Sequence, residues 1–85
     1  MARIFITGSA DGLGLMEARM LVSQGHQVVL HGRNRERADD ARSKVPGAQT
    51  ALAADLASVA ETRALADQVN QLGQFDAVIH NAGVY

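Results

Sequence analysis

The sequence predicts an α/β fold built on a doubly wound parallel sheet, with four strands and three helices. Short, continuously apolar segments alternate with longer amphipathic segments, as in β-α-β units, and turn residues separate them. Right-handed crossovers in such a chain give the strand order 3-2-1-4, with two helices on one face of the sheet and the third on the other. The 85 residues have room for a single domain.

The first strand and the first helix are the most clearly marked elements. The strand Arg3–Thr7 is apolar and rich in β-branched residues, as expected of a strand buried on both faces. A helix over residues 13–24 follows and ends before Gly25. Three of its apolar residues share one face: Leu15, Ala18 and Val22. Met16 and Met20 lie one turn apart on this helix, and we expect both to pack in the core.

The middle of the chain predicts a second β-α-β unit. A short apolar strand covers residues 28–30, and Asn34 is the predicted N-cap of a charged helix, Arg35–Lys44. Thr50–Ala53 is the predicted third strand, although its alanines have a low strand propensity.

The last part of the chain predicts a helix and an edge strand. Ser58 and Glu61 have the spacing of a capping box, and the apolar pattern carries this helix to Gly73. Residues 75–80 form the fourth strand. The third helix would then lie alone on its face, and the fourth strand would have an unpaired edge where a fifth strand normally lies. This arrangement predicts a truncated doubly wound sheet.

The charge balance and composition exclude several classes of function. The chain has eight Lys and Arg residues and nine Asp and Glu residues, which gives a net charge of −1. This charge produces no general field that would attract nucleic acid or an anionic membrane. No apolar run is long enough to span a membrane or to act as a signal peptide. The absence of cysteine excludes disulfides and thiolate chemistry, and the three scattered histidines have no metal-site spacing. We therefore expect a cytoplasmic protein without a metal site.

A glycine-rich loop lies where the first strand becomes the first helix. Gly8 permits a tight turn, Gly12 lets the backbone approach a pyrophosphate, and Gly14 lets the helix pack close to the sheet. The N–H groups of the first helical turn then form a local anion site. A triphosphate-binding P-loop needs Lys-Ser/Thr after its last glycine, which this sequence lacks. The loop therefore predicts a dinucleotide site, and the alternative is a purely structural turn. The candidate contacts of the loop are Gly8, Ser9, Asp11, Gly12, Leu13 and Gly14.

The end of the second strand predicts which dinucleotide binds. A free ribose 2′-hydroxyl favours an Asp or Glu about twenty residues after the loop, but this sequence has Arg33 and Asn34 there. A guanidinium forms charge-assisted, bidentate hydrogen bonds with a 2′-phosphate. We therefore expect NADP(H) in preference to NAD(H). The alternative is that Arg33, Arg35 and Arg37 are only the solvated entrance of a helix.

The chain resembles the short-chain dehydrogenases/reductases over its whole length. The glycines in Thr7-Gly8-x-x-x-Gly12-x-Gly14 have the spacing of that family, whereas other Rossmann enzymes have Gly-x-Gly-x-x-Gly. Asp55 and Leu56 look like the adenine-contacting acidic position of the family. Residues 80–83, His-Asn-Ala-Gly, resemble its Asn-Asn-Ala-Gly motif, with His80 in place of the first asparagine. By this resemblance, the stretch formed by Asn81, Ala82 and Gly83 would steady the sheet and pass close to the adenosine ribose.

The resemblance implies an NADP(H)-dependent oxidoreductase that transfers hydride between nicotinamide and a carbonyl or alcohol substrate. The catalytic set of the family is a Ser and a Tyr-x-x-x-Lys pair, but this chain has one tyrosine, Tyr85, with nothing after it, and one lysine, Lys44. We therefore assign no catalytic residue, and expect residues 1–85 to be the N-terminal part of a single Rossmann-like NAD(P)-binding domain, inactive alone. The family also suggests a homo-oligomer. The alternative is a non-enzymatic nucleotide-binding module that pairs with a partner through its fourth strand.

Overall fold

The structure is a computed structural model, and it describes residues 1–10 and 12–81. Asp11, Ala82 and Gly83, which the sequence assigns to the cofactor site, lie outside the described residues.

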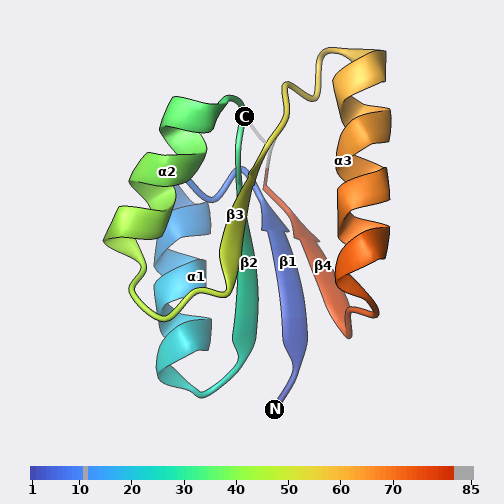
Figure 1. Cartoon of the computed structure of the whole chain (residues 1–85). Coiled ribbons are helices and arrows are strands. Elements are labelled where there is room, and N and C mark those ends of the chain that lie inside the picture. Colours follow the sequence, from blue (N-terminus) through green and yellow to red (C-terminus); the bar gives the residue numbers. More distant parts are fainter. Residues whose placement is uncertain (11, 82–85) are drawn as a thin grey trace.

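A four-stranded parallel sheet separates the helices into two layers (Figure 1). The strands are β1 (Arg3–Thr7), β2 (Gln27–Gly32), β3 (Thr50–Ala53) and β4 (Ala77–His80). The helices are α1 (Gly12–Ser23), α2 (Arg35–Lys44) and α3 (Val59–Leu72). The sheet order is β3-β2-β1-β4, which confirms the predicted doubly wound topology. In Figure 1, α1 and α2 cover one face and α3 covers the other.

Each face of the sheet has its own apolar core, because successive side chains of a strand point to opposite faces. Ile4 and Ile6 of β1 belong to the core beneath α1 and α2, whereas Phe5 belongs to the core beneath α3. Leu65 is the buried residue of α3 in this second core. The continuous apolar run of β1 thus supplies both cores, as a parallel strand covered on both sides should.

Two strands differ in length from the prediction. β2 extends beyond residues 28–30 because His31 and Gly32 pair in register with Leu52 and Ala53 of β3, a backbone interaction that does not require apolar side chains. β4 begins at Ala77 and not at residue 75.

The residues just before β4 serve to anchor β1. Asp76 accepts a hydrogen bond from the Arg3 main-chain N–H through Oδ2 (2.7 Å) and donates its own N–H to the Arg3 carbonyl (2.8 Å). The Phe75 ring lies 4.7 Å beneath the Arg3 guanidinium. Residues 75 and 76, which the sequence places in the fourth strand, thus contact Arg3 mainly through their side chains and lie outside β4.

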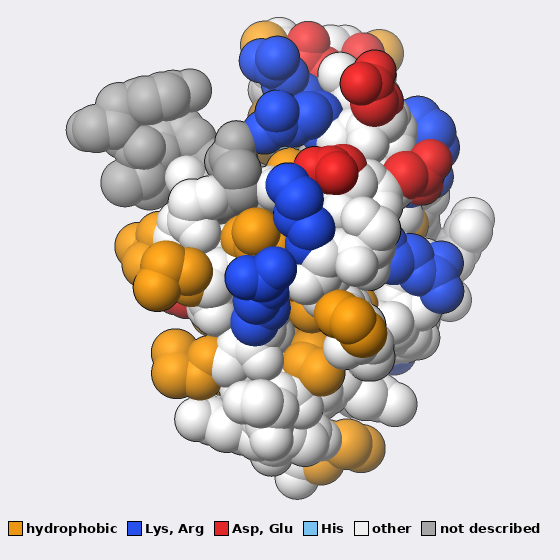
Figure 2. Space-filling view, turned by 90° about the vertical axis from the view of Figure 1, so that its left-hand side faces the viewer, with side chains coloured by type: hydrophobic (Ala, Val, Ile, Leu, Met, Phe, Trp, Pro, Cys, Tyr) orange, Lys and Arg blue, Asp and Glu red, His pale blue; other side chains and the backbone are white. Residues whose placement is uncertain are grey.

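The outer face of α1 corrects the prediction that Met16 and Met20 pack in the core. Both are exposed, by 65% and 54%, and Leu13 on the same stripe is 67% exposed. The helical period turns Leu15, Ala18 and Val22 toward the sheet and leaves the methionines on the opposite side. Figure 2 shows hydrophobic side chains exposed among the Lys and Arg side chains of the face that carries α1 and α2.

The edge of the sheet at β4 is open within the described residues, as predicted, because β4 pairs only with β1. Val78 in this strand is 46% exposed. Among residues 1–10 and 12–81, no helix combines the length and the apolar character needed to cross a membrane.

Candidate functional site

The candidate site lies at the carboxyl edge of the sheet, where the parallel strands all end. The glycine loop follows β1, Arg33 follows β2, Asp55 follows β3 and Asn81 follows β4. The strand order places the end of β1 between those of β2 and β4 (Figure 1). In open α/β sheets, ligands bind outside this edge where the connections diverge to opposite faces, here beside β1.

The backbone of the glycine loop has the conformation that the sequence predicts. Gly8 and Gly12 have positive φ angles, of 64° and 58°. A Cβ built on Gly14 would lie 2.4 Å from the Gly8 carbonyl oxygen, so the start of α1 packs directly on the turn that leaves β1. A Cβ on Gly12 would meet no described atom within 4 Å. The loop is therefore closed toward the sheet and open at Gly12, which fits the close approach of a pyrophosphate.

The Ser9 side chain faces the protein interior. Its Oγ accepts the His31 main-chain N–H (2.7 Å) and donates to the His31 carbonyl (3.2 Å), which also accepts the Ser9 N–H (3.0 Å). Ser9 is wholly buried. Ser9 thus fastens the glycine loop to the end of β2. Its side chain is not exposed to a ligand.

The His31 side chain lies beneath the same loop and forms hydrogen bonds through both ring nitrogens. Its Nδ1 accepts the Gly8 N–H (2.9 Å), and its Nε2 donates to the Ala54 carbonyl (2.8 Å). Burial lowers the pKa of the His31 imidazole below its usual 6.5, and the hydrogen bond with Ala54 acts in the opposite direction.

This pKa shift predicts a loss of stability in acid. Between the lowered folded-state pKa and about pH 6.5 the unfolded chain binds the extra proton, so the free energy of unfolding falls as the pH falls through this window. Above pH 6.5 the contribution of neutral His31 is fully present. Urea unfolding at a series of pH values should show that the free energy of unfolding falls more steeply in acid for the wild type than for His31→Asn. Parallel pH profiles for the two proteins would contradict a lowered pKa of His31.

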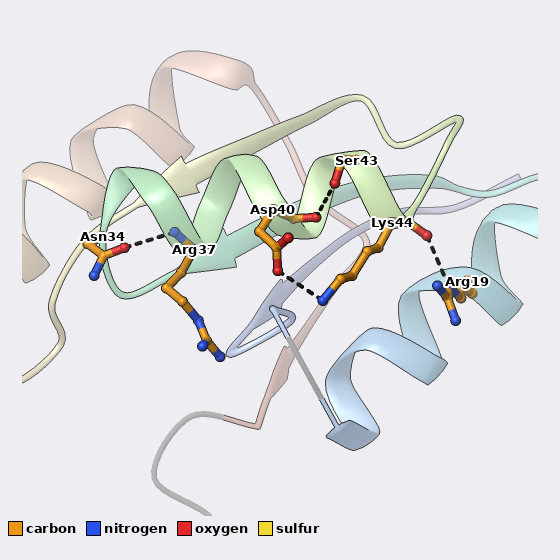
Figure 3. Close-up of polar contacts among 6 residues, drawn as sticks. All are labelled: Arg19, Asn34, Arg37, Asp40, Ser43 and Lys44. Carbon is orange, nitrogen blue, oxygen red and sulfur yellow. Dashed lines mark hydrogen bonds and ion pairs between the residues drawn. The ribbon is translucent and has the colours of Figure 1, made fainter.

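The arginines after β2 have different environments. Arg35 donates from Nη2 to the Ala51 carbonyl (2.7 Å) and pairs through Nε with Asp39 (3.2 Å). Arg37 extends from α2 toward the loop between β1 and α1 (Figure 3). Arg33 is exposed, and it makes no hydrogen bond or ion pair with the described part of the chain. Arg33 is therefore the guanidinium of this group that is available to an anionic ligand.

Asn34 begins α2, as predicted. Its Oδ1 accepts the Arg37 N–H at 2.8 Å, which caps the helix and fixes the turn that carries Arg33 (Figure 3). Gly32 makes this turn possible, because a Cβ there would lie 2.5 Å from the Ala38 nitrogen.

The loop after β3 is held by hydrogen bonds to the first turn of α3. Ser58 caps α3 by accepting the Glu61 N–H (3.2 Å), whereas the Glu61 carboxylate reaches back to the Asp55 N–H (2.9 Å) and not to Ser58. The Asp55 carboxylate accepts the Ala57 N–H (3.0 Å), and Leu56 is 37% exposed. Asp55 is thus ordered by local hydrogen bonds at the rim of the site.

Asn81 joins the end of β4 to the end of β1. Its main-chain N–H donates to Thr7 Oγ1 (3.2 Å), and Thr7 is itself buried. The Asn81 side-chain nitrogen is buried and has no hydrogen-bond partner among residues 1–10 and 12–81.

The sequence pattern assigns no role at this edge to His31, Gly32 or Arg37. His31 lacks the spacing of a metal site, and Arg37 fits the solvated entrance of a helix. The signal that could have found the first two is their position, because the two residues that follow a buried strand line the carboxyl edge of a parallel sheet.

Comparisons with known proteins agree with this fold. Residues 2–85 match the family model for short chain dehydrogenases, and the chain belongs to this family. Short-chain dehydrogenase chry4 of Gibberella zeae is 61% identical over 84 residues, which cover 99% of this chain and 32% of that protein. Short-chain dehydrogenase chyC of Penicillium rubens is 58% identical over 84 residues, covering 99% of this chain and 33% of its own length. The chain thus spans about a third of the length of these relatives.

Solved structures show the same architecture. The Pseudomonas aeruginosa RhlG/NADP active-site complex superposes with a TM-score of 0.87 at 32% identity, over 96% of this chain and 34% of that one. Menthone neomenthol reductase from Mentha piperita superposes with a TM-score of 0.82 at 27% identity, over 98% of this chain and 32% of that one. The family implies a nicotinamide dinucleotide cofactor.

Proposed function

We propose that this chain is the dinucleotide-binding part of an NADP(H)-dependent oxidoreductase, which transfers hydride between nicotinamide and a carbonyl or alcohol substrate. The proposed contacts come from the loops at the carboxyl edge of the sheet. They are the glycine-loop residues Gly8, Ser9, Asp11, Gly12, Leu13 and Gly14, then Arg33 and Asn34, then Asp55 and Leu56, and finally Asn81, Ala82 and Gly83. Within this set, the buried Ser9 acts by holding the glycine loop in place and not by direct contact.

The proposed preference for NADP(H) rests on the Arg33 guanidinium at the end of β2. This side chain is exposed and makes no hydrogen bond or ion pair with the described part of the chain. Residues 30–34 are Leu-His-Gly-Arg-Asn, so no carboxylate in this segment would accept a ribose 2′-hydroxyl or repel a 2′-phosphate. The likeness to the RhlG/NADP complex supports the same cofactor.

Each loop has a distinct task in this proposal. The N–H groups at the start of α1 hold the pyrophosphate, with Gly12 leaving room for it. Arg33 pairs with the 2′-phosphate, and the loop at Asp55 meets the adenine. The bound cofactor supplies or accepts the hydride. Because the chain lacks the Ser and the Tyr-x-x-x-Lys pair of the family, its residues bind and orient the cofactor and leave proton transfer to other residues.

Titration of the purified protein with NADPH and with NADH tests this proposal. One charge-assisted interaction with the 2′-phosphate contributes about 1.5–3 kcal/mol, so NADPH should bind about ten- to a hundredfold more tightly than NADH. Isothermal titration calorimetry measures both dissociation constants. Equal affinities would contradict the NADP(H) preference, and the absence of binding to either would contradict the nucleotide site.

We also propose that the whole protein forms a homo-oligomer and is located in the cytoplasm. The alternative of a stand-alone nucleotide-binding module that pairs through β4 uses the same cofactor site, so the titration does not depend on which of the two functions holds.

A further inference from the structure

The His31 ring occupies a position that the proposed cofactor contacts do not explain. It lies at the carboxyl end of β2, between β1 and β3, and His31 is only 2% exposed. The His31 and Phe5 rings form a T-shaped pair, with centroids 6.4 Å apart and an interplanar angle of 76°. A leucine would fill such a space without the desolvation cost of an imidazole, so the polar atoms of this ring call for an explanation.

Both ring nitrogens are used, and they point to different loops. A main-chain N–H can only donate and a carbonyl can only accept, so Nδ1 carries the lone pair toward Gly8 and Nε2 carries the proton toward Ala54. Gly8 opens the glycine loop, and Ala54 precedes Asp55. One ring therefore connects the loop after β1 to the loop after β3.

We propose that His31 is a positioning residue that sets the distance between the pyrophosphate and adenine sides of the dinucleotide site. This inference rests on the proposed function and adds a residue to it that makes no contact with the cofactor. A dinucleotide must meet both loops at once, so a small change in the spacing of the loops weakens binding although every contact residue is still present.

The two halves of this connection can be removed one at a time. An asparagine side chain places its oxygen where His31 has Nδ1, so His31→Asn keeps the acceptor for Gly8 and loses the donor for Ala54. A glutamine side chain places its nitrogen where His31 has Nε2, so His31→Gln keeps the donor and loses the acceptor. The hydrogen bonds between the His31 main chain and Ser9 do not involve the imidazole, so we expect them to remain in both variants.

The two variants are compared by titration with NADPH and with 2′-AMP, which contains the adenosine and the 2′-phosphate but no pyrophosphate. His31→Gln should weaken NADPH binding about tenfold and leave 2′-AMP binding within about twofold of wild type, because it releases only the glycine loop. His31→Asn should weaken both ligands by a similar factor, because both contain the adenosine that the Ala54–Asp55 segment meets.

The outcomes separate this inference from the proposed function. If the wild type binds neither ligand, the proposed function fails and this inference fails with it. If the wild type binds NADPH but both variants show the same ratio of NADPH to 2′-AMP affinity, His31 is only a structural residue and the inference alone is overturned.

A measurement on the wild type serves if a variant does not fold. The imidazole ¹⁵N resonances of His31 are followed during titration with NADPH and with 2′-AMP. We expect saturating NADPH to shift the Nδ1 signal and 2′-AMP to shift mainly the Nε2 signal. Ring signals that do not respond to either bound ligand would overturn the proposal.

Discussion

Replacement of Gly14 by alanine is expected to destabilise the protein and to weaken NADPH binding together. The new Cβ would lie 2.4 Å from the Gly8 carbonyl oxygen and 3.1 Å from the Ser9 Cα, and main-chain atoms cannot rotate away as a side chain can. Helix α1 must therefore move off the glycine loop. We expect the free energy of unfolding to fall by about 1–3 kcal/mol, the usual cost of overpacking, as measured by urea unfolding.

The sign of this effect is diagnostic. Inside an ordinary helix, glycine to alanine stabilises by about 0.5–1 kcal/mol, so a loss at Gly14 must come from the contact with the loop. Met16→Ala is the matched control, because this side chain is 65% exposed on the same helix and should change stability by less than about 0.5 kcal/mol. A Gly14→Ala protein as stable as wild type, with unchanged NADPH affinity, would show that α1 does not need this close approach.

Replacement of Arg33 by alanine is expected to remove the preference for NADPH. The loss of a charge-assisted contact with the 2′-phosphate should raise the dissociation constant of NADPH about ten- to a hundredfold and leave that of NADH within about threefold. Fluorescence titration with both reduced cofactors measures the two constants.

Arg35→Ala is the control for the loss of a positive charge. Its guanidinium is held by Ala51 and Asp39, so its removal changes the net charge equally but should weaken NADPH no more than about threefold. If Arg35→Ala weakens NADPH as much as Arg33→Ala, the preference comes from the general field of α2 and not from a contact with Arg33.

The sequence predicts the topology because the apolar pattern and the turn residues agree with each other. The β1 run supplies both cores, and Asn34 and Ser58 each cap the helix that the sequence assigns to them. The reciprocal half of the predicted capping box does not form, because the Glu61 carboxylate accepts the Asp55 N–H in place of the Ser58 N–H. The end of β2 is missed because a parallel ladder is made by the backbone, so His31 and Gly32 carry no apolar signal. The direction in which the two methionines of α1 point is also missed, since both faces of that helix are apolar in sequence.

The sequence predicts which loops form the candidate site but not the hydrogen bonds that connect these loops. Spacing identifies the glycines and Arg33, because these roles follow from local conformation and from position after a strand. The hydrogen bonds of His31 to Gly8 and Ala54 join residues 23 positions apart in each direction, and no local pattern encodes them. The direction in which Arg37 extends from α2 (Figure 3) likewise depends on how α2 packs on Gly32.

A crystal structure of the protein with NADPH bound would locate the pyrophosphate and the 2′-phosphate directly. We expect the pyrophosphate at the start of α1 beside Gly12 and the 2′-phosphate within hydrogen-bonding distance of the Arg33 guanidinium. A nucleotide bound away from the carboxyl edge of the sheet, or a 2′-phosphate that points away from Arg33, would contradict it.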